Sequence, residues 1–189
     1  MTVKPEAAKS ALVEKAVAHA RERLTGPMAT AVEGFVRAYY ADAAPEDLGE
    51  LDLYGAALAH WHFLQRRRPG EVKVHAYTPT LEEHGWASPH SVVEIVTDDM
   101  PFLVDSVAMA LTRRGDAIHV FVHPMIKVLR DGSVRLRTHG KRAQMVHPNA
   151  GRLQVTVGFH SAAAGDGANR CSTTLQTFRA GRNGRLITP

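Results

Sequence analysis

The first part of the chain has its apolar residues three or four positions apart. Within residues 8–24 they form one stripe: Leu12, Val13, Ala16, Val17, Ala20 and Leu24. The same spacing recurs over 28–40 and over 53–64, and Gly26-Pro27 separates the first two stretches. This spacing, with Gly and Pro as breaks, is typical of amphipathic helices. We therefore expect a helical lead-in of about three helices over residues 1–69.

Beyond Gly70 the pattern changes to an alternation of apolar and polar residues, which is typical of strands. Val72, Val74 and Ala76 alternate with polar neighbours, and residues 91–97 form a run rich in β-branched side chains. Both stretches are expected to be strands of one sheet.

A helix is expected after these strands, from about Pro101 to Arg114, where Gly115 ends the apolar stripe. Asp98 and Asp99 precede it as candidate capping residues, because a carboxylate can accept the free N–H groups at a helix start. We therefore interpret these two adjacent acids as structural residues and not as catalytic ones.

Two further strands complete the mixed unit. Alternation runs over 118–128, and Pro124 indicates a bulge or an edge position because proline cannot donate to a strand ladder. Asp131-Gly132 is a strong turn signal, and a returning strand is expected over 134–138. The order strand, helix, strand, strand predicts an α+β fold, with this unit over residues 70–140.

Residues 141–189 differ from the rest in charge. They hold 7 Lys and Arg against 1 acidic residue, a balance of +6, whereas residues 1–140 hold 16 against 18, a balance of −2. One strand is expected over 153–159, and 161–169 has the Gly- and Ala-rich composition of a linker. We expect a basic, partly disordered tail, so the overall charge of +4 belongs mainly to it.

Composition narrows the class of protein further. No apolar run reaches the roughly 20 residues needed to cross a bilayer, and residues 1–24 lack the order of a secretory signal. The single cysteine, Cys171, excludes an internal disulfide and agrees with a reducing compartment. We expect a cytoplasmic protein that does not contact a membrane.

The candidate chemical motifs favour structural roles. His60 and His62 point to different sides of a helix, and His119 and His123 would lie roughly 13 Å apart along a strand, so no metal site is expected. No glycine-rich turn of the dinucleotide-binding type stands between a strand and a helix, and no catalytic residues are identified. The Arg66-Arg67-Arg68 run suits a helix end, and the tail lacks interleaved aromatic residues, so nucleic acid is not an expected partner.

The most specific motif is the nine-residue string from Asp98 to Ser106, Asp-Asp-Met-Pro-Phe-Leu-Val-Asp-Ser, inside a longer match from Gly85. This string resembles the amino-terminal region of the large bacterial NAD-specific glutamate dehydrogenases. Further motifs fit the same region: Asp52-Leu-Tyr-Gly55, Trp61 to Arg68, His123-Pro124 and Arg130-Asp131-Gly132. The resemblance covers about Ala31 to Arg137 and fades after about Gly140.

The resemblance implies that residues 70–140 form an ACT-like regulatory domain, a ferredoxin-like βαββ partial sandwich between the helical lead-in and a poorly ordered C-terminal tail. It also implies a candidate effector or interface loop at Asp98, Asp99, Met100, Pro101 and Phe102. Amino-acid-sensing ACT domains usually carry glycine where this chain has Phe102. A bulky residue there favours contact with a neighbouring subunit or domain over binding of an amino acid.

Two functions follow from the resemblance. The first is a regulatory and assembly segment of an NAD-dependent glutamate dehydrogenase, which oxidatively deaminates glutamate to 2-oxoglutarate, with NAD bound outside this chain. The second is a free-standing, dimeric ACT-like sensor with a small amino-acid effector. Expected partners are a second copy or the remainder of a dehydrogenase chain. The basic tail favours a fragment or a frame-disrupted product over an independent small protein.

Overall fold

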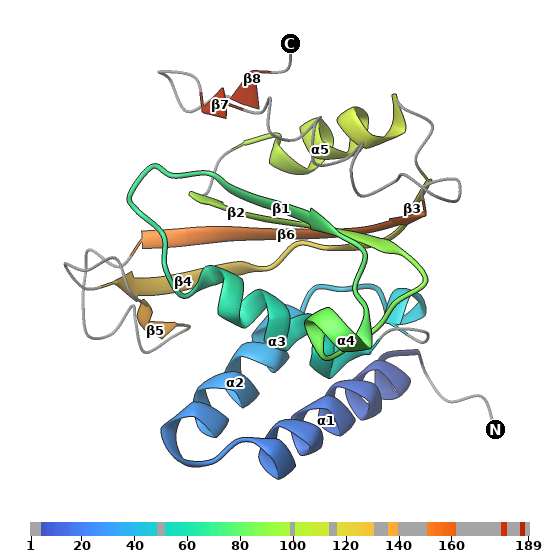
Figure 1. Cartoon of the computed structure of the whole chain (residues 1–189), viewed down its shortest axis with the longest axis vertical. Coiled ribbons are helices and arrows are strands. Elements are labelled where there is room, and N and C mark those ends of the chain that lie inside the picture. The colour runs from blue at the N-terminus through green and yellow to red at the C-terminus, as the bar shows by residue number, and fades with distance from the viewer. Residues whose placement is uncertain are drawn as a thin grey trace.

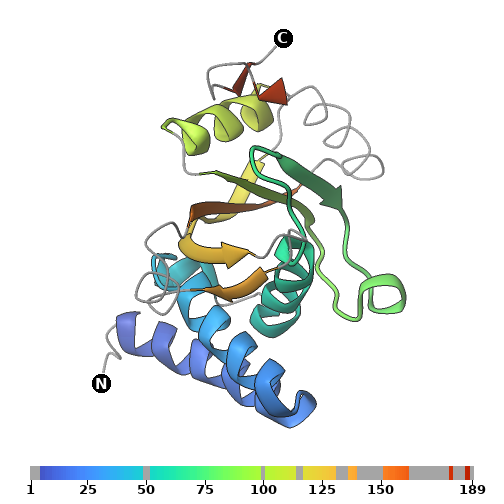
Figure 2. The same ribbon diagram turned by 90° about the vertical axis from the view of Figure 1, so that its left-hand side faces the viewer.

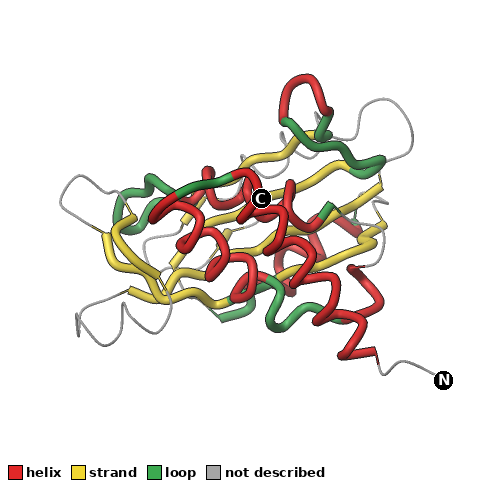
Figure 3. The backbone as a smooth tube through the Cα atoms, turned by 90° about the horizontal axis from the view of Figure 1, so that it is seen from below, coloured by secondary structure: helices red, strands yellow, loops and turns green. Residues whose placement is uncertain are grey.

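The computed structural model describes residues 5–48, 52–98, 101–113, 117–130, 136–139, 151–161, 179–180 and 186–187. In this part of the chain a sheet lies between one helix, α5, and a layer of N-terminal helices (Figure 1). The view from the side shows the same three layers (Figure 2), and the view from below shows the N-terminal helices lying across the strands (Figure 3). The protein therefore has the mixed α+β architecture that the sequence pattern predicts.

The three expected N-terminal helices are confirmed as α1 (Pro5–Arg23), α2 (Gly26–Tyr39) and α3 (Leu53–Leu64). Two short elements were not expected: a 3-10 helix, η1 (Pro45–Leu48), and the single-turn helix α4 (Leu81–His84). The Tyr40 hydroxyl donates to the Leu53 carbonyl at 2.9 Å and so ties the end of α2 to the start of α3.

Six antiparallel strands form the main sheet: β1 (Lys73–Tyr77), β2 (Ser91–Asp98), β3 (Ala117–Val122), β4 (Met125–Arg130), β5 (Leu136–His139) and β6 (Gly151–Ser161). Their order is β1-β2-β6-β4-β5, and β3 also pairs with β6. A separate two-stranded sheet contains β7 (Arg179–Ala180) and β8 (Leu186–Ile187).

The strand expected over 153–159 has a central place in this sheet. As β6 it pairs with β2 along one edge and with β3 and β4 along the other. The sequence pattern had placed it in a tail beyond the mixed unit at 70–140. Alternation of apolar and polar residues predicts that a strand is present. It does not predict which strands pair with it, because those strands lie far away in the sequence.

β3 and β4 behave as one long strand along β6. Val122 pairs with Val157 and Met125 pairs with Gln154, so the register is the same on both sides of the break at His123-Pro124. The strand is interrupted at Pro124 as expected, but the unchanged register shows no bulge there; the register shift of β3 lies between Ile118 and Val120. Proline lacks the N–H group that would continue the ladder, but it leaves the strand direction and register unchanged.

Alternate residues of β2 belong to two separate hydrophobic cores, one on each face of the sheet. Val92 and Val96 pack with α1, α2 and α3, whereas Val93 and Ile95 pack with α5. Seven of the eight β2 residues are buried, Asp98 being the exception, because helices cover both faces of this strand. The N-terminal helices are therefore an integral layer of the fold.

Candidate functional site

The turn between β2 and α5 is the place where the sequence located its candidate effector or interface loop. β2 ends at Asp98, and α5 runs from Leu103 to Thr112. Asp99 and Met100 lie outside the described residues. Pro101 and Phe102 are exposed and lead directly into the helix. In Figure 1, α5 lies over the face of the sheet that is opposite the N-terminal helices.

Asp98 does not cap the helix, contrary to expectation. The N-cap residue of α5 is Phe102, which has no side-chain capping bond, and the helix begins two residues after Pro101. Asp98 instead accepts a hydrogen bond and ion pair from Arg67 Nη1 at 2.7 Å. A carboxylate at the end of a strand pairs with a cation that lies close to it in space. The spacing of residues along the sequence does not show which cation will lie there.

Arg67 is the residue near this turn that the sequence interpretation missed. Its side chain is only 4% exposed, although it stands in a run of three arginines that suggested a solvated helix end. Besides pairing with Asp98, its Nε donates to the Glu71 carbonyl at 2.6 Å. Arg67 therefore links the segment after α3 to the end of β2, just before the turn. No feature of the run distinguishes Arg67 from its exposed neighbours.

Phe102 has an unusual conformation for a large side chain. Its φ is 62° and its ψ is 16°, which is the left-handed region, and it is the only non-glycine residue with positive φ within the described ranges. The ring is 77% exposed. Glycine adopts this conformation without steric strain, whereas a residue with a Cβ is destabilised by about 1–2 kcal/mol. The position where sensing ACT domains carry glycine thus has glycine-like geometry and a phenylalanine side chain.

The outward face of α5 extends this exposed surface. Met109, seven residues after Phe102 and therefore about two turns further along, is 52% exposed. Asp105 and Arg113 are exposed on the same helix, whereas Leu103, Val107, Ala110 and Leu111 are buried against the sheet. Phe102 and Met109 therefore give α5 an exposed apolar stripe with charged neighbours.

The β2–α5 turn does not fit a dinucleotide. A dinucleotide site of the doubly wound type needs parallel strands and a glycine-rich turn that leads into a helix. Here the paired strands are antiparallel, and the turn carries Pro101 and Phe102 where glycines would be needed.

Within the described ranges, no three His, Cys, Asp or Glu side chains are placed to hold a metal ion. No helix there is long and apolar enough to span a bilayer.

A second motif from the sequence, Asp52 to Gly55, lies at the start of α3 and packs this helix against Trp86, in the segment between α4 and β2. Asp52 is the N-cap of α3, and its Oδ1 accepts a hydrogen bond from Gly55 N at 2.8 Å. Gly55 lies directly against Trp86, so that a Cβ at position 55 would be 2.8 Å from Trp86 Cγ. Trp86 itself is only 2% exposed. This motif therefore has a packing role, in which glycine is needed for close approach and aspartate for the cap.

The antiparallel sheet, with α5 on one face and a strand-to-helix turn at its end, defines an ACT-type α+β domain with an added helical layer. Residues 35–165 match the family model described as the ACT1 domain of glutamate dehydrogenase. The chain therefore belongs to this glutamate dehydrogenase family. The match continues to residue 165 and includes β6, beyond the point near Gly140 where the sequence resemblance was expected to fade.

Two curated relatives are similar over the same region. The NAD-specific glutamate dehydrogenase of Halomonas elongata is 39% identical over 138 residues, which are 71% of this chain and 9% of that protein. The enzyme of the same name from Pseudomonas aeruginosa is 42% identical over 86 residues, which are 46% of this chain and 5% of that protein. The chain thus spans less than a tenth of these relatives. No solved structure matches it significantly.

Proposed function

We propose that this chain is a non-catalytic regulatory and assembly segment of an NAD-dependent glutamate dehydrogenase polypeptide in the cytoplasm, and that the β2–α5 turn contacts another part of the enzyme. The observation that carries the proposal is Phe102, whose ring is 77% exposed on a backbone with φ of 62°. A strained, exposed aromatic residue destabilises the free chain, and a contact that buries the ring offsets this loss.

The surface around Phe102 supports a protein partner. Met109 adds a second exposed apolar side chain on the same helix, and Asp105 and Arg113 supply charges beside it. Aromatic and methionine side chains are enriched in protein interfaces, and charged groups are common at their rims. More than nine-tenths of each relative lies outside the matched region. The partner is therefore the remainder of a dehydrogenase chain or a second copy of this region.

An activity assay tests the non-catalytic part of the proposal. The purified chain is expected to give no reduction of NAD with glutamate, because the turn does not fit a dinucleotide and the glutamate and NAD residues lie elsewhere in the enzyme. Reduction of NAD by the pure chain, at a rate proportional to its concentration, would show that the proposal is wrong.

A binding assay tests the interface. The purified chain would be mixed with the Halomonas elongata enzyme from which the matched region has been deleted, and co-elution would be followed by size-exclusion chromatography. We expect binding by the wild type and at least tenfold weaker binding by Phe102→Gly, since a buried aromatic anchor often contributes more than about 1.4 kcal/mol.

The matched control is Leu81→Ser, which removes another large side chain, 72% exposed, on α4. This variant should bind like the wild type. Phe102→Gly should also be more stable than the wild type in isolation, because glycine relieves the left-handed strain. Equal binding by Phe102→Gly and the wild type would exclude this turn as the interface. Self-association of the chain alone, lost in the same variant, would identify a second copy as the partner.

The alternative function is a free-standing ACT-like amino-acid sensor. One observation favours it: α5 begins without a side-chain cap, and amide groups at a helix start attract carboxylates. A thermal-shift panel of amino acids at millimolar concentration would distinguish the two functions. A specific stabilisation that is lost in Phe102 or Asp99 variants supports the sensor, whereas no response supports the assembly segment.

A further inference from the structure

A buried carboxylate lies where the helical layer meets the sheet. Glu94 stands in the middle of β2 and is only 2% exposed. The register pairs it with His75 of the neighbouring strand β1, and α3 brings His60 to it from the helical layer. Three elements that are separate in sequence therefore converge on one acidic side chain.

Each oxygen of this carboxylate faces one imidazole. His60 Nδ1 is 3.3 Å from Glu94 Oε1, and His75 Nδ1 is 3.4 Å from Oε2. The His60 side chain is fully buried, whereas that of His75 is 49% exposed. Tyr77, on the same strand as His75, donates its hydroxyl hydrogen to Oε1 over a long distance of 3.5 Å. All three groups thus lie within 3.5 Å of the carboxylate, and the two imidazoles are slightly closer to it than the Tyr77 hydroxyl.

Glu94 is ionised at neutral pH in this environment. Burial alone would raise the pKa of its carboxyl group, but the two facing imidazoles lower that pKa to about 2. A buried anion is strongly destabilising unless a cation or good hydrogen bonds compensate it. A protonated imidazole supplies positive charge at this position, whereas a neutral imidazole supplies at most a hydrogen bond.

The other ionisable groups around Glu94 do not provide that charge. From α2, Tyr39 approaches the His60 ring, and burial raises the pKa of its hydroxyl well above the ordinary value. Burial and the nearby Glu94 likewise raise the pKa of Tyr77. Both phenols are therefore neutral, and they do not balance a negative carboxylate.

The remaining neighbours are engaged elsewhere. Lys73 of β1 donates its ammonium hydrogens to the carbonyls of Phe63 and Arg66 at the end of α3. From α4, His84 stacks on Tyr77 with ring centroids 4.7 Å apart and faces Glu83. On β6, the residue opposite Glu94 is the apolar Val157. Among the side chains that the structure describes, His60 and His75 are thus the groups next to Glu94 that can supply a positive charge, when they are protonated.

We propose that His60, Glu94 and His75 form a proton-sensitive clamp, which holds α3 against β1 and β2 more firmly when the imidazoles are protonated than when they are neutral. The clamp would make the attachment of the helical layer depend on pH, because an imidazole carries a positive charge only when it is protonated. It is independent of the β2–α5 turn, because its three residues face the helical layer on the other side of the sheet.

The test compares the pH dependence of stability in the full 189-residue chain. Urea unfolding would be measured from about pH 5.5 to about pH 8.5, on either side of the histidine range, for the wild type, Glu94→Gln and the control His62→Gln. His62 is exposed on the same helix as His60, so its loss changes the histidine count without touching the clamp.

The wild type and His62→Gln are expected to show an unfolding equilibrium constant that rises roughly tenfold across this range, the size of one hydrogen bond to a charged group. In Glu94→Gln this rise should be lost, because the amide no longer attracts the imidazolium ions. An equal rise in Glu94→Gln and the wild type would overturn the proposal.

A second variant keeps the test decisive if Glu94→Gln does not fold. His75 is half exposed, so His75→Gln should fold, and it should retain only part of the wild-type pH dependence. If His75→Gln keeps the full dependence, the clamp is wrong.

Discussion

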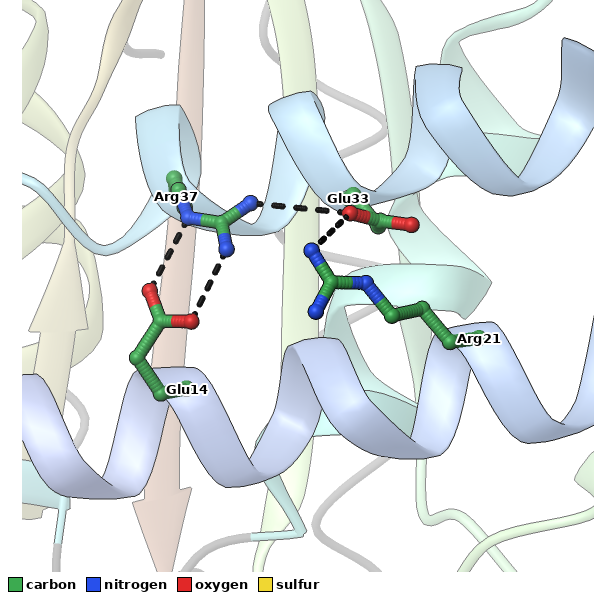
Figure 4. Close-up of polar contacts among 4 residues, drawn as sticks. All are labelled: Glu14, Arg21, Glu33 and Arg37. Carbon is green, nitrogen blue, oxygen red and sulfur yellow. Dashed lines mark hydrogen bonds and ion pairs between the residues drawn. The ribbon is translucent and has the colours of Figure 1, made fainter.

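Two of the polar junctions of the helical layer differ in their exposure to water. Between α1 and α2, Arg37 contacts Glu14 and Glu33, and Arg21 contacts Glu33 (Figure 4). The Arg37–Glu14 pair is bidentate, with distances of 3.0 and 2.8 Å. Between α3 and the sheet, Glu94 lies between two imidazoles at 3.3 and 3.4 Å. The bidentate Arg37–Glu14 pair of the outer junction thus has the shorter distances, and the inner junction has the buried charge.

Burial decides which junction matters more for stability. Water and salt screen the outer pairs, and exposed ion pairs contribute little even when their geometry is good. The hydrogen bonds from Arg37 and Arg21 lower the pKa values of Glu14 and Glu33, but water reaches these pairs, so they add little to the stability of the fold. At the inner junction, loss of one partner leaves a charge or a polar ring in an apolar core.

The largest effect is expected from Glu94→Ala. This change leaves His60 fully buried without its acidic partner and opens a space between β2 and α3. Breaking a buried ion pair on one side typically destabilises by about 3–5 kcal/mol. Urea unfolding at pH 6 should show a loss of unfolding free energy of this order. A loss below about 1 kcal/mol would mean that the inner junction contributes no more to stability than exposed ion pairs do.

Acid should weaken the inner junction next. The folded-state pKa of Glu94 is about 2, below its ordinary value, so its contribution is complete above about pH 4.3 and is lost as the pH falls toward 2. The total is up to roughly 3 kcal/mol. Acid unfolding curves of the wild type should therefore be steeper between pH 4 and 2 than those of Glu94→Gln, which has no carboxyl group to protonate. Parallel curves would contradict the assigned pKa.

Gly55→Ala tests the packing of the same layer without changing any charge. The new methyl group would overlap Trp86, whose buried ring cannot move freely, so we expect a destabilisation of about 2–3 kcal/mol that does not depend on pH or salt. Thermal unfolding measures it. Gly70→Ala is the control for adding a methyl group, because a Cβ there meets no atom within 4 Å; its positive φ of 72° contributes only the smaller backbone strain.

Periodicity predicted most of the longer elements of this fold, but it did not predict the contacts between them. The three N-terminal helices, the strands of the main sheet and the break at Pro124 follow from local spacing and from proline's missing N–H group, whereas η1, α4, β7 and β8 were not expected. The place of β6 at the centre of the sheet does not, because strand pairing depends on segments more than fifty positions away. The capping role expected for Asp98 is wrong for the same reason, since Arg67 is distant in sequence.

The candidate loop could be identified from the sequence, whereas the inner junction left only a weak signal there. Phe102 was recognised because a bulky residue stands where glycine is usual, and its φ of 62° supports that reasoning. Glu94 did leave a signal, as the one charged residue inside the β-branched run of residues 91–97. His60 was considered only as a possible metal ligand, and its complete burial was not foreseen, because a helical pattern does not say which layer will cover each face.

The smallest effect is expected at the outer junction, from Arg37→Gln. Its guanidinium group contacts both Glu14 and Glu33, so one change removes the middle of the network in Figure 4. Urea unfolding at low salt should show a slight loss of stability that disappears in about 1 M sodium chloride, where the screening length is only about 3 Å. Lys15→Gln, an exposed change on α1 outside the network, controls for the loss of one positive charge. A loss that persists in salt and equals that of Gly55→Ala would mean that the exposed pairs hold the helical layer as firmly as its buried packing does.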